Sequence, residues 1–196
     1  MKGNNMDMSK LTQTLLEFAK ASGDTGGLEI NLVRIDEIIL RLPSEMAKAN
    51  SNYIVSIEFK SLPEDEESLL VFGNETLLLT AIKNIVLNAC KYSNNQRAFV
   101  VLEIAERMLK VTISDDGKGI PEAELKTIFQ PFYRVEDNVS SHGFGLGLSL
   151  AERIIKLHKG SVEVRSQLNV GTDFMIFLPP AQLLNTGNSN EILIHN

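Results

Sequence analysis

The sequence predicts an α+β two-layer sandwich, in which helices cover one face of a mixed β-sheet. Two observations lead to this fold class. Segments that alternate apolar and polar residues, as half-buried strands do, are separated by segments with the apolar spacing of helices. Strand pairs joined by short turns follow towards the end of the chain, which is typical of β-hairpins.

Composition limits the classes of protein to which the chain can belong. Its 196 residues, 43% of them hydrophobic, suit one domain with appendages. A net charge of −6 argues against a surface for nucleic acid or anionic membrane, so a bound nucleotide would need a locally positive pocket. We find neither a membrane-spanning run nor a secretion signal, and we expect a soluble, cytoplasmic chain without membrane contact. The single cysteine, Cys90, is interpreted as a small apolar residue on a helix flank.

The first part of the chain predicts two helices. Apolar residues recur at helical spacing over 11–18, and the glycines of 23–27 should end this first helix, which is an appendage. Asp36 is a plausible N-cap for the second helix. Pro43 lacks a backbone donor, so we expect it to kink or interrupt that helix, with the break near Leu42.

The remaining elements follow from alternation and capping. A short extended piece is expected around 29–33, and the expected strands run over 53–59, 69–72, 99–105, 109–114, 161–166 and 172–178. Asn74 can cap a central helix that should end near Ser93. The inner face of this helix carries Leu78, Ile82, Ile85 and Ala89.

The first chemically informative patch, Asn84–Ser93, lies on that central helix. Asn84, Asn88 and Lys91 stand at i, i+4 and i+7 and so share one stripe. An amide oxygen suits Mg²⁺, and a lysine ammonium can meet a phosphate, so we expect Asn88 to ligate the metal. The alternative is a merely solvated stripe, which this helix alone would slightly favour.

The second patch, Asp115–Ile120, follows a predicted strand. Asp115 has the parity of the inward-facing apolar residues of that strand, and an adenine amino group would supply its carboxylate with a donor. Gly117 and Gly119 would let the backbone approach a base and turn sharply. An ordinary Asp-Asp-Gly turn explains this patch equally well by itself. We expect Asp116 to be solvated.

The third and fourth patches supply aromatic packing and backbone donors. The third is Phe129–Arg134. In the fourth, Gly143, Gly145 and Gly147 open a helix that Gly160 should cap, and they would present N–H groups to an anion. A polar stretch at 136–142 stands where a dinucleotide-binding fold would need a strand, and we interpret it as a mobile lid.

In this order and spacing the four patches resemble the catalytic ATP-binding domain of bacterial sensor histidine kinases. The resemblance covers roughly residues 30–179 and extends to the wider superfamily of gyrase, chaperone and mismatch-repair ATPases. It implies a Bergerat-type ATP-binding fold. The implied motifs are an N box at 84–93, a first glycine box at 115–120, an F box at 129–132 and a second glycine box at 143–148.

The resemblance also implies ATP and Mg²⁺ as ligands and a role for each matching residue. Asp115 would read adenine, with Thr172 under the base. Asn84, Asn88 and Lys91 would be the catalytic residues, and Asn88 would hold the metal. The implied nucleotide-binding residues are Tyr92, Asp115, Gly117, Gly119, Ile120, Phe132, Arg134, Gly143, Gly145, Leu146, Gly147, Leu148 and Thr172.

Two departures from the family pattern matter. Gyrase-like hydrolases place a water-activating glutamate where this chain has Asn84, and an amide cannot take that proton, so fast hydrolysis is disfavoured. The second departure concerns the phosphoacceptor, because His142, His158 and His195 all lack the setting of the histidine that such kinases phosphorylate.

These observations lead to an expected division of the chain and an expected function. Residues 1–27 would be a remnant of a preceding dimerisation hairpin with its linker, 28–180 the ATP-binding catalytic domain, and 181–196 a polar tail. The domain would give the γ-phosphoryl group of ATP to a histidine that this chain lacks. Its partners would be the phosphoacceptor hairpin of the same kinase and the receiver domain of a response regulator.

Two other classes of function remain open from the sequence. One is a nucleotide-sensing module that binds ATP without transferring it, for which Lys118 and Pro131 are mild irregularities in the motifs. The other is an ATP-driven clamp of the gyrase type, which Asn84 disfavours.

Overall fold

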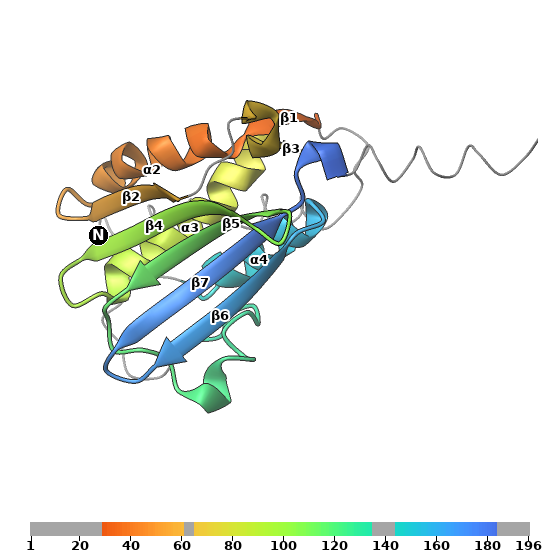
Figure 1. The fold of residues 1–196 in the computed structure, drawn as a ribbon. Helices are drawn as coiled ribbons and strands as arrows, with labels where there is room; N and C mark the ends of the chain where they lie inside the picture. Colours follow the sequence, from red (N-terminus) through yellow and green to blue (C-terminus); the bar gives the residue numbers. More distant parts are fainter. Residues whose placement is uncertain (1–28, 61–64, 135–143, 184–196) are drawn as a thin grey trace, which may run out of the picture.

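The computed structural model describes residues 29–60, 65–134 and 144–183. One layer is a five-stranded mixed sheet, and the helices pack on one of its faces (Figure 1). The predicted two-layer α+β sandwich is thus confirmed. The first helix over 11–18, the lid at 136–142 and the tail beyond residue 183 lie outside the described residues, so the predicted domain limits stay predictions.

The main sheet has the strand order β2-β4-β5-β7-β6. Its strands are β2 (Ile54–Lys60), β4 (Arg97–Ala105), β5 (Met108–Asp115), β6 (Ser161–Gln167) and β7 (Gly171–Leu178). Strand β2 is parallel to β4, and the other neighbours are antiparallel. The turn between β4 and β5 has positive φ at Glu106 and Arg107, as a tight hairpin requires.

A second, two-stranded sheet pairs β1 (Asn31–Arg34) with β3 (Leu70–Gly73). The sequence predicted β1 as a short extended piece and β3 as a strand, but could not show that they pair with each other and not with the main sheet. In Figure 1 they lie beyond the β2 edge, beside the start of α2. Val33 and Val71 are partners in the register, and both are buried in the core.

The central helix α3 (Glu75–Tyr92) forms as predicted. The side chain of Asn74 caps it by accepting a hydrogen bond of 3.0 Å from the Leu77 N–H. Its predicted inner face is completely or almost completely buried against the sheet and the other helices. Cys90 is buried as well, and this burial raises the pKa of its thiol to about 11. The interpretation of Cys90 as a packing residue is therefore confirmed.

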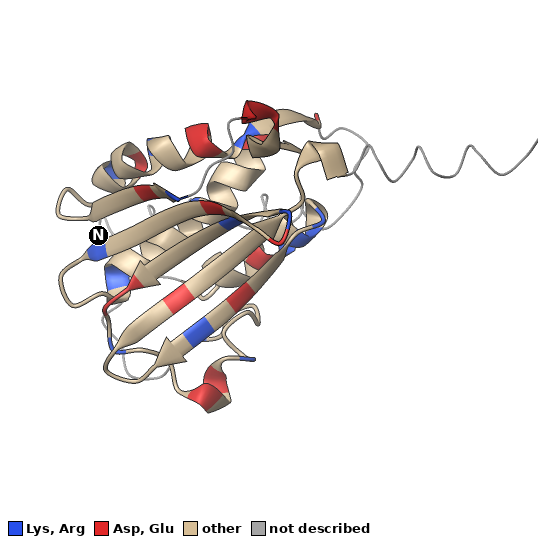
Figure 2. Cartoon of the chain, in the orientation of Figure 1, with Lys and Arg blue, Asp and Glu red and all other residues tan. Residues whose placement is uncertain are grey.

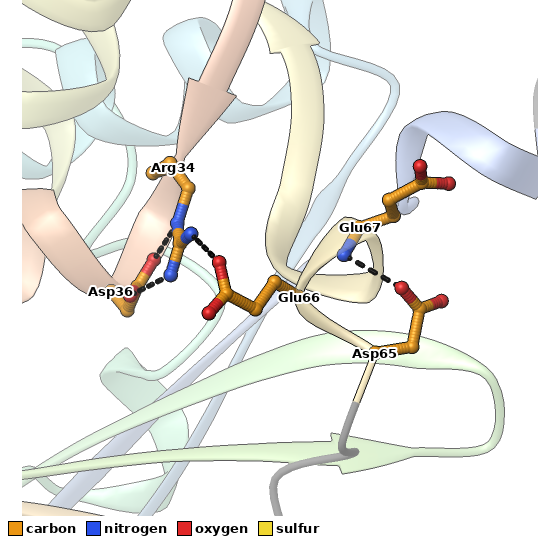
Figure 3. Close-up of polar contacts among 5 residues, drawn as sticks. All are labelled: Arg34, Asp36, Asp65, Glu66 and Glu67. Atoms are coloured by element: carbon orange, nitrogen blue, oxygen red, sulfur yellow. Dashed lines mark hydrogen bonds and ion pairs between the residues drawn. The ribbon is translucent and has the colours of Figure 1, made fainter.

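Helix α2 (Ile35–Ala49) corrects the predicted N-cap. Arg34, and not Asp36, occupies the N-cap position, and Asp36 lies in the first turn. Arg34 donates to Asp36 over 3.0 and 2.7 Å and to Glu66 over 2.6 Å (Figure 3). Glu66 begins a 3₁₀ helix, Glu66–Leu69. The ion pairs therefore join the start of α2 to the segment that leads into β3.

The predicted interruption at Pro43 is also wrong, because α2 continues through this residue. Pro43 is exposed, whereas Ile39, Leu42 and Met46 on the other side of the helix are fully buried. Burial of each such side chain contributes about 1.5 to 3 kcal/mol. Together they offset a missing hydrogen bond, whose net contribution is about 1 kcal/mol.

Helix α4 (Gly147–Leu157) ends in a way that differs from the prediction. Lys159, and not Gly160, has the left-handed conformation, with φ of 58°. The N–H of Gly160 donates to the Ile155 carbonyl over 2.9 Å, which closes a Schellman motif. Gly160 is required for space, since an added Cβ would lie 2.4 Å from the Phe177 oxygen.

His158 ties the end of α4 to the start of α3. Its buried ring accepts a hydrogen bond of 3.0 Å at Nε2 from the Asn74 N–H, so its Nδ1 carries the proton and donates to the Ile154 carbonyl over 2.7 Å. Burial lowers the pKa of the imidazole. None of the helices in the described part of the chain combines the length and the apolar character needed to span a bilayer.

Candidate functional site

The polar residues predicted to share one stripe of α3, Asn84, Asn88 and Lys91, are partly exposed beside the buried face of this helix. Asn84 faces the start of α4, where a Cβ added to Gly147 would lie 3.5 Å from the Asn84 Oδ1 atom. The N box and the second glycine box are therefore in contact. Within the described residues, the side-chain amides of Asn84 and Asn88 form no hydrogen bond, so their oxygens can accept from or coordinate a ligand.

Asp115 ends strand β5 and is half-buried. Its carboxylate accepts a hydrogen bond of 2.8 Å from the Gly117 N–H. Burial raises the pKa of Asp115 to about 6, and the charges of Asp116 and Asp173 act in the same direction. A neutral donor, such as an exocyclic amine, would therefore fit this carboxylate well.

Asp116, which the sequence predicted to be solvated, is partly buried and hydrogen-bonded. Its carboxylate accepts hydrogen bonds from the Ser93 hydroxyl, at 2.5 Å, and from the Asn95 amide, at 2.8 Å. Its carbonyl oxygen accepts from the Asn94 amide at 2.5 Å. These three donors follow the end of α3 directly, and the prediction missed them because it considered the strand and not the neighbouring helix end.

The glycines of the first glycine box allow close approach between backbones. A Cβ on Gly117 would lie 2.2 Å from the Tyr92 oxygen at the end of α3. Gly119 has φ of 71°, and a Cβ there would lie 2.2 Å from the Gln167 oxygen. The Lys118 carbonyl accepts from the Asn169 N–H over 2.8 Å. The irregular lysine of this box is thus fixed through its backbone, which any residue would provide.

Ser166 and Thr172 support the first glycine box from the β6–β7 hairpin. The Ile120 N–H donates to the Ser166 Oγ over 2.8 Å, and that hydroxyl lies 2.9 Å from both the Gly171 oxygen and the Thr172 Oγ1. Thr172 is 5% exposed and pairs with Asp115 across the sheet. No local sequence pattern indicated Ser166, because its role depends on the strand pairing.

The F box lies against the second glycine box. The Phe132 N–H donates to the Gly145 carbonyl over 2.9 Å. Gly145 has φ of 69°, and a Cβ there would lie 2.7 Å from the Tyr133 oxygen. The side chain of Phe132 is 65% exposed. Gly143 lies outside the described residues.

The remaining predicted residues surround these contacts. Tyr92 is 38% exposed, with the Lys91 ammonium 5.1 Å from its ring centre. Leu146 is buried at the N-cap position of α4, where it provides no side-chain cap, and Arg134 is exposed. The uncapped N–H groups of the first turn can therefore bind an anion. Ile120 and Leu148 are partly buried against the core.

Basic residues are dispersed over several elements of the described chain and alternate with acidic ones (Figure 2). Positive charge for a nucleotide would thus come from individual side chains and from the α4 terminus. The residues present fit a nucleotide with a divalent cation. They offer a carboxylate for a base amine, amide oxygens for a hard metal ion and backbone donors for phosphate.

Comparison with known proteins adds a family match. Residues 73–182 match the family described as histidine kinase-, DNA gyrase B-, and HSP90-like ATPase. The adaptive-response sensory kinase SasA of Gloeothece citriformis is 30% identical over 174 residues, which are 88% of this chain and 44% of that protein. The chain spans less than half the length of such curated relatives.

Solved structures share the fold. Full-length ShkA in complex with AMPPNP gives a TM-score of 0.74 at 22% identity, covering 91% of this chain and 37% of that one. The mycobacterial sensor histidine kinase MprB gives a TM-score of 0.63 at 28% identity, covering 78% of this chain and 99% of that one.

Proposed function

The chain belongs to the family of histidine kinase-, DNA gyrase B-, and HSP90-like ATPases, and from this premise we propose that it is the ATP-binding catalytic domain of a two-component sensor histidine kinase. It binds ATP together with Mg²⁺. It then delivers the γ-phosphoryl group to a histidine on a helical hairpin, from which a response regulator receives it.

The observation that carries this proposal is the contact between patches that are distant in the sequence. Gly117 lies against the end of α3 at Tyr92, and Gly147 lies against Asn84 of the same helix. A carboxylate suited to adenine and an anion-binding helix terminus therefore lie near opposite ends of the polar stripe of α3. A nucleotide has its base at one end and its phosphates at the other. The Asp115 carboxylate and the α4 terminus are arranged in the same way, with one near each end of the stripe.

Each residue has a definite part in the proposed binding. Asp115 accepts a hydrogen bond from the adenine amine, which guanine replaces with a carbonyl at that edge. Lys91 and Arg134 approach phosphates as cations, and the N–H groups at the start of α4 donate to phosphate oxygens. Asn88 supplies an oxygen ligand to Mg²⁺, which when bound neutralises part of the charge on the phosphates.

Asn84 favours phosphoryl transfer over hydrolysis. A side-chain amide cannot remove a proton from water, so it can orient a ligand but cannot act as a general base. The domain therefore holds ATP until an acceptor arrives, and catalysis consists mainly of positioning and charge neutralisation.

Calorimetry with ATP and GTP, each with and without Mg²⁺, tests the binding part of the proposal. We expect ATP to bind at least about tenfold more tightly than GTP, because one charge-assisted hydrogen bond distinguishes them. Asp115→Asn should reduce this ratio. Equal affinities for the two nucleotides would contradict the assignment of Asp115.

A further inference from the structure

Asp116 is held by three consecutive residues that follow α3. The Ser93 hydroxyl donates to its Oδ1 over 2.5 Å and the Asn95 amide to its Oδ2 over 2.8 Å, while the Asn94 amide donates to its carbonyl oxygen over 2.5 Å. Two side chains thus use both carboxylate oxygens, and a third fixes the backbone of the same residue. We call Ser93, Asn94, Asn95 and Asp116 the helix-end clamp.

Ser93 is the centre of the helix-end clamp. It is 8% exposed, and its oxygen also accepts from the N–H groups of Asn95 and Arg97, at 3.4 and 3.3 Å. Its hydroxyl lies near two acceptors, the Asp116 carboxylate at 2.5 Å and the Asn95 side-chain oxygen at 2.8 Å. A hydroxyl has one proton, and a hydrogen bond to the charged carboxylate is stronger than one to a neutral amide oxygen.

The clamp joins two parts of the proposed pocket. On one side, Asp115 precedes Asp116 in the chain and is paired with Thr172 of β7. On the other side, Ser93 is the C-cap of α3, the helix that carries Asn84, Asn88 and Lys91. The backbones already approach closely, since a Cβ on Gly117 would lie 2.2 Å from the Tyr92 oxygen.

We propose that Asp116 is a positioning residue for the nucleotide: through the helix-end clamp it fixes the carboxylate of Asp115 relative to the phosphate-facing stripe of α3. This inference rests on the proposed function. Because the base and the phosphates of one ligand must reach both groups at once, a fixed separation between them lowers the entropy lost on binding.

The position of Asp116 has an electrostatic cost, because its negative charge lies close to the carboxylate of Asp115. The charge of Asp116 helps to raise the pKa of Asp115, and Asp173 on β7 acts in the same way. Asp173 is exposed and has no hydrogen bond among its side-chain contacts in the described residues. It therefore provides a matched control, a nearby carboxylate that is not part of the clamp.

The test measures ATP and GTP affinity by calorimetry, with Mg²⁺ present, for the wild-type chain, Asp116→Ala, Ser93→Ala, their double variant and Asp173→Asn. We expect Asp116→Ala to weaken ATP binding about tenfold and GTP binding less than about twofold, because only ATP uses the Asp115 contact. Ser93→Ala should act in the same direction, and the double variant should lose less than the sum. Asp173→Asn should change neither affinity by more than about twofold.

Several outcomes would overturn the proposal. Unchanged ATP affinity in Asp116→Ala would show that the clamp does not position Asp115, and an equal loss for ATP and GTP would indicate general loosening of the fold. The same loss in Asp173→Asn would assign the effect to charge.

If Asp116→Ala does not fold, Ser93→Ala and the conservative Asp116→Asn carry the same comparison, and Asp116→Asn should retain part of the lost affinity. A wild-type chain that does not bind ATP would overturn the proposed function, and the clamp with it, whereas ATP binding unaffected by these changes overturns the clamp alone.

Discussion

Replacing Asp115 with asparagine should stabilise the domain in the absence of nucleotide and weaken its binding of ATP. In the fold, burial raises the pKa of this carboxyl from its ordinary value of 3.8 to about 6. A change of this size corresponds to about 3 kcal/mol against the ionised form. Water reaches the half-buried group and screens it, so we expect a gain of about 1 to 2 kcal/mol for the variant.

The pH dependence of this gain follows from the direction of the change in pKa. Because the pKa is higher in the folded than in the unfolded state, the folded protein binds more protons between about pH 4 and 6. The stability contributed by Asp115 therefore decreases as the pH rises through that window, and the full cost is present above about pH 6. Asparagine does not titrate there, and its side-chain oxygen can still accept the hydrogen bond from Gly117.

Thermal or urea unfolding without nucleotide, at about pH 5 and about pH 7.5, measures the effect. We expect Asp115→Asn to raise the melting temperature by about 3 to 6 °C at the higher pH and by less at the lower pH. Asp173→Asn is the control, because it removes a smaller contribution to the same pKa and should stabilise less. A variant that is destabilised at neutral pH, or whose gain does not depend on pH, would refute the reasoning.

Three further changes have defined outcomes. Asn88→Ala should remove most of the magnesium-dependent part of the ATP affinity, about tenfold by calorimetry with and without EDTA, while the melting temperature stays near that of the wild type. Burial lowers the pKa of His158, so below about pH 6.5 the unfolded state binds a proton more readily than the folded state. The wild-type chain should therefore lose stability relative to His158→Gln as the pH falls, and melting temperatures measured over a range of pH test this. Asn84→Glu should raise the rate of phosphate release from ATP, since a carboxylate can activate water where the amide cannot, and an unchanged rate would argue against the position of Asn84 near the terminal phosphate.

The elements that the sequence predicted well are determined by local chemistry. Helix α3 begins after the Asn74 cap and ends at Tyr92, just before the Ser93 C-cap, because the cap, the apolar stripe and the following polar residues all favour those limits. The β4–β5 and β6–β7 hairpins likewise follow from alternation within each strand. Family resemblance added the expectation that distant patches meet, which their spacing alone did not require.

The elements that the sequence predicted wrongly depend on tertiary contacts. Pro43 does not interrupt α2, because the opposite face of that helix is buried in the core. Asp36 does not cap α2 and instead forms an ion pair with Arg34. Asp116 is held by residues more than twenty positions earlier in the chain, and no local pattern indicates such a partner. For the same reason Ser166 was not predicted as part of the site.

The transfer of phosphate tests the central claim most directly. The chain is incubated with Mg²⁺ and ATP labelled on its γ-phosphate, either alone or with the helical hairpin that carries the acceptor histidine of its kinase. A hairpin whose acceptor histidine is replaced by glutamine serves as the control. We predict that acid-labile label appears on the intact hairpin and not on the control hairpin or on the chain. Without a hairpin, we predict that the chain consumes little ATP. Label on His142, His158 or His195 of the chain, or rapid ATP hydrolysis by the chain alone, would contradict the proposed function.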